Sequence, residues 1–190
     1  MNTGLLIAIL VIVVVVALLA MLLGRRRRTD RLQQQFGPEY QRTVARTGDQ
    51  RTAETDLTAR ERRRRELDIV ALEPAVRDRY LEAWRTTQGR FVDDPATATR
   101  EADTLVAQVM SDRGYPVDDF EQRAADVSVD HPQVAEHYRA AHALFQANEQ
   151  GLASTDDLRQ AFVHYRSLFS ELLEAGGDGR KEAHDAPAPR

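Results

Sequence analysis

Residues 5–23 form an unbroken apolar run, and this run constrains the fold more than any other stretch of the chain. Its nineteen residues include no charge, proline, glycine or amide side chain, and fifteen of them are Leu, Ile or Val. As a helix the run would be roughly 28 Å long, close to the bilayer hydrocarbon thickness of about 30 Å. Burying those fifteen side chains in lipid would favour insertion by roughly 5–9 kcal/mol. We therefore predict a transmembrane helix within residues 1–24.

Four consecutive basic residues follow the run: Arg25, Arg26, Arg27 and Arg28. Basic flanks stay on the cytoplasmic side, which predicts an N-terminus outside the cell and a cytoplasmic C-terminal domain. The same guanidinium groups suit anionic lipid of the inner leaflet. The alternative is a cleaved signal peptide, which would make the protein secreted. We favour the anchor because the run is too long for a signal core and no basic residue precedes it.

Charge is distributed unevenly along the rest of the chain. Residues 25–66 contain 13 Arg against 7 acidic residues, whereas residues 67–190 contain 13 basic against 23 acidic residues. A basic stem beside the membrane suits an anionic leaflet, and an acidic distal domain argues against nucleic-acid binding. We interpret residues 62–65, all Arg, as a solvated charge run and not as a polyphosphate or nucleic-acid site, because acidic residues bracket it.

Apolar residues recur at helical spacing, and no alternating run of strand length occurs. The sequence predicts an all-α protein: a transmembrane helix, a polar helical stem over residues 25–66, and an antiparallel bundle of about four or five helices over residues 67–175. Residues 176–190, rich in Gly and Pro, are predicted to be a disordered tail. The bundle helices are expected over these ranges: 74–92, 96–113, 117–127, 133–148 and from 154 onward.

Paired carboxylates precede three of these helices: Asp93-Asp94, Asp118-Asp119 and Asp156-Asp157. Asp at a helix start satisfies free backbone N–H groups, so we interpret all three pairs as caps and not as acid–base or metal sites. Ser154 and Asp157 have the spacing of a capping box, with Asp in place of Glu.

No catalytic or cofactor motif is present, and the chain has no Cys. His137 and His142 are five residues apart, so they cannot face one metal as an i,i+4 pair would. A site combining Asp130, His131 and His164 would require tertiary packing, and we treat all four histidines between 131 and 164 as ordinary caps or hydrogen-bonding groups. We therefore predict no catalytic residue, metal ligand or cofactor.

The sequence thus favours a non-enzymatic, membrane-tethered helical module that binds a protein partner or a second copy of itself. The alternative is an all-α ligand- or metal-sensing domain or enzyme. Its site would lie among four residues on the predicted apolar faces: Trp84, Tyr138, His164 and Tyr165. Aromatic residues at this spacing are core in most helical proteins.

Several short segments of the sequence resemble those of one protein family. They are RFVDDP at residues 90–95, RGYPVDDFEQRAADVSVDHP at 113–132, HYRAAH at 137–142 and STDDLRQAFVHYRSLF at 154–169, together with the opening MNTGLLIAIL and the Arg run. With them the chain resembles an uncharacterised family of bacterial single-pass membrane proteins, whose members usually carry labels such as hypothetical or secreted protein. The resemblance covers about residues 1–173. It implies a membrane anchor and brings no activity, ligand or catalytic residue.

Overall fold

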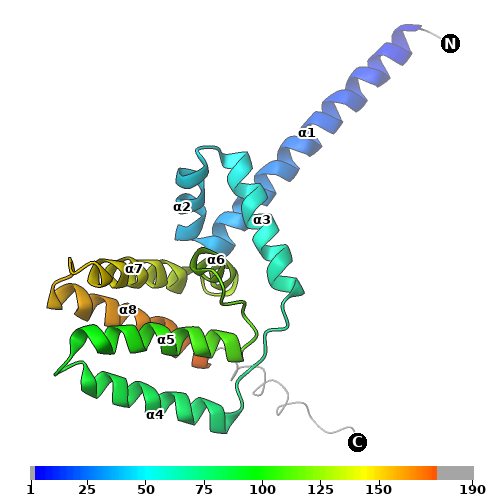
Figure 1. Ribbon diagram of the computed structural model, residues 1–190. Coiled ribbons are helices and arrows are strands. Elements are labelled where there is room, and N and C mark those ends of the chain that lie inside the picture. Colours follow the sequence, from blue (N-terminus) through cyan, green and yellow to red (C-terminus); the bar gives the residue numbers. More distant parts are fainter. Residues whose placement is uncertain (1–2, 175–190) are drawn as a thin grey trace, which may run out of the picture. The chain divides into compact units, whose positions relative to one another are not determined.

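The computed structural model describes residues 3–174, except for the side chains of residues 3–9, 11, 14, 17, 18 and 22. Over these residues the chain is all-α, as predicted, and packs as a helical bundle (Figure 1). Two compact units divide inside one helix, the first ending at Leu57 and the second starting at Thr58. The helices are α1 Thr3–Phe36, α2 Pro38–Thr47, α3 Gln50–Glu66, α4 Pro74–Arg90, α5 Pro95–Asp112, α6 Phe120–Asp130, α7 Pro132–Glu149 and α8 Thr155–Glu174.

The predicted membrane anchor and the predicted disordered tail both remain predictions. Among the described residues, no helix combines the length and the apolar composition that crossing a membrane requires. The transmembrane helix expected within residues 1–24 includes many side chains outside the described set, so it stays a prediction. The disordered tail expected at residues 176–190 lies outside the described residues.

Helix boundaries follow the local signals of the sequence. α1 ends at Phe36, where Gly37 and Pro38 follow, and proline is the first residue of α2, α4, α5 and α7. Asp94 accepts a hydrogen bond from the Thr97 backbone N–H at 3.1 Å, which caps α5. The predicted capping role of this carboxylate is confirmed.

The two remaining predicted caps are also confirmed. Asp119 accepts from the Gln122 backbone N–H at 2.8 Å. Ser154 and Asp157 form the reciprocal capping box: the Ser154 backbone N–H donates to Asp157 Oδ2 at 2.8 Å, and the Asp157 N–H donates to Ser154 Oγ at 3.2 Å. Because Asp119 is the cap, α6 begins at Phe120 and not at residue 117, and it continues beyond the predicted end at residue 127 to Asp130.

In the first unit, one carboxylate connects three helices by hydrogen bonds. Glu54 on α3 accepts hydrogen bonds from Thr29 of α1 at 2.6 Å and from Tyr40 of α2 at 3.1 Å. Gln50 also donates to it at 2.9 Å. Of the described side chains of the unit, five apolar ones are buried: Leu32, Phe36, Tyr40, Ala53 and Leu57. This part of the predicted polar stem therefore has an apolar interior of its own.

In the second unit, α4 to α8 share one hydrophobic core. Trp84 of α4 stacks on Phe169 of α8, with ring centroids 4.6 Å apart, and lies 5.0 Å from Phe162. Phe91 also lies 5.0 Å from Phe162. The aromatic stripes of α4 and α8 thus pack against each other, as expected for core residues.

The helix pairs do not all run antiparallel. α4 and α5 form an antiparallel hairpin, and so do α7 and α8 (Figure 1). By contrast, Asp103 of α5 contacts Tyr165 of α8, and Arg113, directly after α5, contacts Leu172 near the end of α8. α5 and α8 are therefore parallel, and the purely antiparallel bundle expected from the short loops is only partly realised. Figure 1 shows α6 nearly end-on, across the direction of its neighbours, so α7 is the helix that reverses the chain between α5 and α8.

Candidate functional site

The four residues of the predicted alternative site do not surround one cavity. Trp84 is part of the aromatic stack with Phe162 and Phe169. His164 contacts His137 on the neighbouring helix. Only Tyr138 and Tyr165 contact each other, edge to face, with ring centroids 6.3 Å apart. Of the four residues of the predicted alternative site, the structure therefore brings Tyr138 and Tyr165 together.

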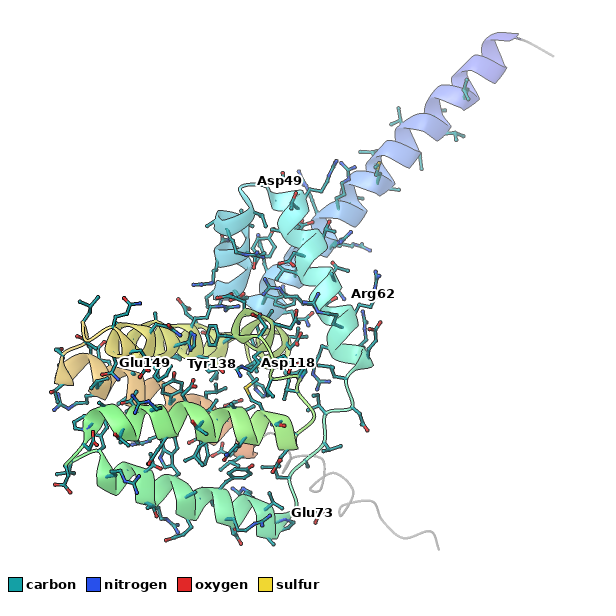
Figure 2. The ribbon with its side chains drawn as sticks, viewed as in Figure 1. Asp49, Arg62, Glu73, Asp118, Tyr138 and Glu149 are labelled. Atoms are coloured by element: carbon teal, nitrogen blue, oxygen red, sulfur yellow. The ribbon has the colours of Figure 1, made fainter. Side chains whose placement is uncertain are left out.

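The tyrosine pair belongs to a group of polar side chains from four helices, which we name the polar cluster. Its members are Asp103 of α5, Arg123 of α6, Tyr138 and His142 of α7, and Tyr165 of α8. The Tyr165 hydroxyl donates to Asp103 Oδ1 at 2.9 Å, and His142 Nδ1 lies 4.0 Å from the same oxygen. Figure 2 shows Tyr138 on α7, the helix that contributes two of the five residues.

Burial raises the pKa of both tyrosines of the polar cluster further above physiological pH. Desolvation is the main cause that raises the pKa of Tyr165, and the negative charge of Asp103 raises it further. Desolvation also raises the pKa of Tyr138, against the lowering effect of the Arg123 charge. Both hydroxyls are therefore hydrogen-bond donors at physiological pH.

Three buried polar atoms of the polar cluster have no hydrogen-bond partner among the described residues: Tyr138 Oη, Arg123 Nε and His142 Nδ1. Phe120 links them, because its ring stacks on His142 with centroids 3.6 Å apart, lies 4.8 Å from the Tyr138 ring and faces the Arg123 guanidinium at 5.9 Å. Buried polar groups in proteins are normally hydrogen-bonded. A hydroxyl donor, an imidazole and a cation at one place have the chemistry to bind a small polar or anionic group.

The other histidines lie in separate contacts. His131 Nδ1 lies 2.9 Å from Glu171 Oε1, and His137 Nδ1 lies 2.8 Å from His164 Nδ1. Asp130 instead accepts from Arg64 and from the Tyr115 hydroxyl. The conceivable site of Asp130, His131 and His164 is therefore not assembled. Within the described part of the chain, no group of three or more His, Asp or Glu side chains is arranged to hold a metal ion.

The arginine runs differ in their surroundings. The predicted membrane-proximal residues Arg25, Arg26, Arg27 and Arg28 are exposed on α1. In α3, by contrast, Arg64 pairs with Asp130 and Arg63 Nε lies 3.7 Å from the buried Asp126.

Arg60 of α3 is also buried, and it donates to Ser128 of α6 at 3.4 Å. Arg62 extends into open space (Figure 2). Within the predicted solvated charge run, Arg63 and Arg64 thus reach across to acidic residues of α6, contacts that the sequence did not predict.

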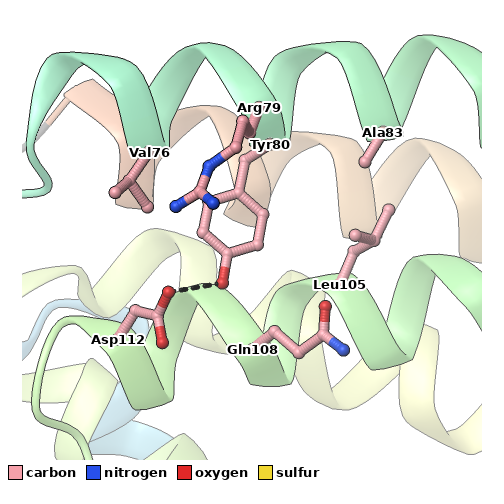
Figure 3. Close-up of a pocket in the computed structure, with 7 residues that line it drawn as sticks. All are labelled: Val76, Arg79, Tyr80, Ala83, Leu105, Gln108 and Asp112. Carbon is pink, nitrogen blue, oxygen red and sulfur yellow. Dashed lines mark hydrogen bonds between the residues drawn. The ribbon is translucent and has the colours of Figure 1, made fainter.

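A cavity of about 320 Å³ lies between α4 and α5 (Figure 3). Val76, Tyr80, Ala83 and Leu105 supply its apolar wall, and Arg79, Gln108 and Asp112 its polar edge. The Tyr80 hydroxyl donates to Asp112 Oδ2 at 2.8 Å, and desolvation followed by that bond raises the pKa of Tyr80 to about 12. The sequence did not predict this cavity.

Comparisons with protein families, with curated proteins and with solved structures found no match. The family resemblance described from the sequence therefore stays a prediction.

Proposed function

We propose that this protein is a membrane-tethered helical module that binds a protein partner or a second copy of itself at the cytoplasmic face of the membrane. The observation that carries the proposal is the surface of α1. Eight large apolar side chains between Leu10 and Leu23 are exposed, each by 47–64%. Exposing this apolar surface to water is unfavourable, whereas burying it in the hydrocarbon core of a membrane is favourable.

The charge pattern supports the orientation. Arg25 to Arg28 come directly after the apolar stretch and are exposed along α1, where they would meet anionic headgroups. Basic residues at that place resist translocation, so the unit that follows stays on the cytoplasmic side. The resemblance to single-pass membrane proteins agrees with this arrangement.

Protease protection tests the anchor and its orientation together. With an epitope placed after Glu174, we expect the full chain in the membrane pellet after carbonate washing. The epitope should resist protease in intact cells and be digested in opened cells. A mature chain that begins beyond residue 24, or that accumulates in the medium, would contradict the proposal.

Cross-linking in membranes tests the interaction role. We expect a cross-linked species of defined mass from the full chain, either a homodimer or a complex with a co-purifying protein. A matched sample in which residues 5–23 are replaced by an unrelated transmembrane helix separates association through the anchor from association through the bundle. Recovery of monomer alone from both samples would count against an interaction module.

A second candidate function is a ligand-sensing domain, and the polar cluster favours it. Three buried polar atoms there lack a hydrogen-bond partner among the described side chains, and Arg123 supplies a positive charge. Thermal-shift screening against small anions and metabolites tests this candidate. A ligand whose stabilising effect is lost in Arg123→Gln would establish it, and an absence of any stabilising ligand would remove it.

A further inference from the structure

His137 and His164 bring two imidazole rings together across the α7–α8 hairpin. Their Nδ1 atoms are 2.8 Å apart, with ring centroids 4.9 Å apart and an angle of 40° between the planes. His137 is exposed and His164 is half-buried, so the pair is open to solvent on one side. Tight packing of α7 on α8 sets the backbone positions from which both rings project.

The separation of the two nitrogens matches a metal coordination geometry. Two nitrogens bound to one metal at about 2.0–2.1 Å lie about 2.8–3.0 Å apart when they subtend 90°, and about 3.3–3.4 Å apart at a tetrahedral angle. The observed 2.8 Å fits two adjacent positions of a square-planar or octahedral ion. Among imidazole-binding metals, Cu(II) and Ni(II) prefer that geometry, whereas Zn(II) prefers the tetrahedral one.

No carboxylate is described in hydrogen-bond contact with either ring, whereas His131 on the same hairpin is engaged by Glu171. The described polar neighbour of each Nδ1 atom is therefore the Nδ1 atom of the other ring.

We propose that His137 and His164 form a two-histidine site for a divalent late transition metal of the Ni(II) or Cu(II) type. In the metal-free pair one Nδ1 carries a proton and the other accepts its hydrogen bond. On metal binding the donor ring changes tautomer, so that its proton is on Nε2, both Nδ1 lone pairs bind the ion and water fills the other coordination positions. Because the ligands come from different helices, the bound ion cross-links α7 to α8. Metal binding at this site therefore stabilises the last helical hairpin. The site is independent of the membrane anchor and of the polar cluster.

Thermal unfolding of the untagged full chain in detergent micelles, followed by circular dichroism, tests the site. NiCl2 is the probe and MgCl2 the control ion. A ligand that binds only the folded state raises Tm, and for a chain of this size we expect an increase of roughly 5 °C at a nickel concentration well above Kd. EDTA should reverse the increase.

The variants His137→Gln and His164→Gln should each lose the nickel-induced increase. His131→Gln is the matched control, because His131 Nδ1 contacts Glu171 and not the histidine pair, and this variant should keep the increase in full. Each variant is compared with and without nickel, so a change in its own stability does not affect the result. The proposal is overturned if the full chain shows no increase with NiCl2 or CuCl2, or if the increase survives in His164→Gln.

Discussion

Tyr138 and Tyr165 bring the same side chain into the same core from adjacent helices, yet their hydroxyls differ in bonding. Tyr165 donates to Asp103 at 2.9 Å, whereas the Tyr138 hydroxyl makes no hydrogen bond of ordinary geometry and has the Arg123 guanidinium as its polar neighbour. A buried hydroxyl without a partner costs stability, and a bonded one adds to it. The pair therefore allows the value of one hydrogen bond to be measured inside a single core.

Tyr165→Phe should lower the free energy of unfolding by about 1–2 kcal/mol, because it removes the bond to Asp103 and leaves that carboxylate with fewer partners. Tyr138→Phe, the matched control, should leave the free energy unchanged or raise it by up to about 1 kcal/mol. Urea denaturation measures both. A Tyr138→Phe loss as large as that of Tyr165→Phe would mean that the Tyr138 hydroxyl binds a group such as water or a ligand.

The histidine pair makes stability depend on pH. Burial, with His137 as the second cause, lowers the pKa of His164 below its ordinary value of 6.5. The unfolded chain then binds a proton more readily than the folded chain, so the stabilisation is present above pH 6.5 and is lost as the pH falls through the folded pKa. We expect urea midpoints, without added metal, to decrease between pH 7.5 and pH 5.5. His164→Gln should flatten this part of the profile, and an unchanged profile would refute the assignment.

At the scale of elements, Gly114 controls how the chain leaves α5. It has φ of +95°, and a Cβ there would collide with the backbone oxygen of Asp68. Arg113 beside it is buried and donates to Val70 O at 3.2 Å and to Leu172 O at 2.7 Å. The end of α5, the segment before α4 and the end of α8 therefore meet at this turn.

Gly114→Ala should lower the free energy of unfolding by more than about 2 kcal/mol, since it combines positive-φ strain with a backbone collision. Gly89→Ala is the matched control. Gly89 is an exposed residue of α4, and a Cβ added there would have no atom within 4 Å. The substitution should therefore raise the free energy of unfolding by about 0.5–1 kcal/mol. Calorimetry of the two variants gives the comparison, and equal Tm values would contradict it.

α3 and α6 are joined by long side chains. Arg64 pairs with Asp130, which also accepts from the Tyr115 hydroxyl at 3.1 Å, and Arg63 reaches toward Asp126. A double-mutant cycle with Arg64→Ala and Asp130→Ala should give a coupling energy of about 0.5–1.5 kcal/mol, because both groups are shielded from solvent in part. Arg62→Ala, in the same run but exposed, should change the stability by less than about 0.5 kcal/mol. A coupling energy near zero would mean that the pair contributes nothing.

Helix boundaries could be predicted from the sequence because their signals are local. Asp94, Asp119 and Ser154 each act within three residues of their own position. The parallel pairing of α5 with α8 could not be predicted, since it depends on contacts such as Asp103 with Tyr165, 62 residues apart.

The same limit applies to the candidate site. Tyr138 and Tyr165 could be named from their place on apolar stripes. Asp103 and Arg123 could not, because a single charged residue on a helix has the same pattern as a solvent-facing one. The histidine pair was missed for the same reason, since helix periodicity does not show which residues of α7 and α8 face each other.

At the scale of the whole molecule, the compact units divide at residue 57, nine residues before the predicted end of the stem. The second unit includes the arginines of α3 that contact α6. We therefore expect a fragment of residues 58–190 to unfold cooperatively. A fragment of residues 67–190 should have a Tm lower by several degrees, because it lacks Arg60, Arg63 and Arg64. Equal Tm values in circular dichroism would show that α3 does not stabilise the bundle.

Trp84 is the single tryptophan of the chain, and it is stacked between Phe162 and Phe169 in the core of the second unit. The protein thus has one indole fluorophore, shielded from water when that unit is folded. A red shift of its emission would report opening of the bundle alone. The N-terminal unit has no indole, so the emission reports unfolding of the bundle without a contribution from lipid insertion.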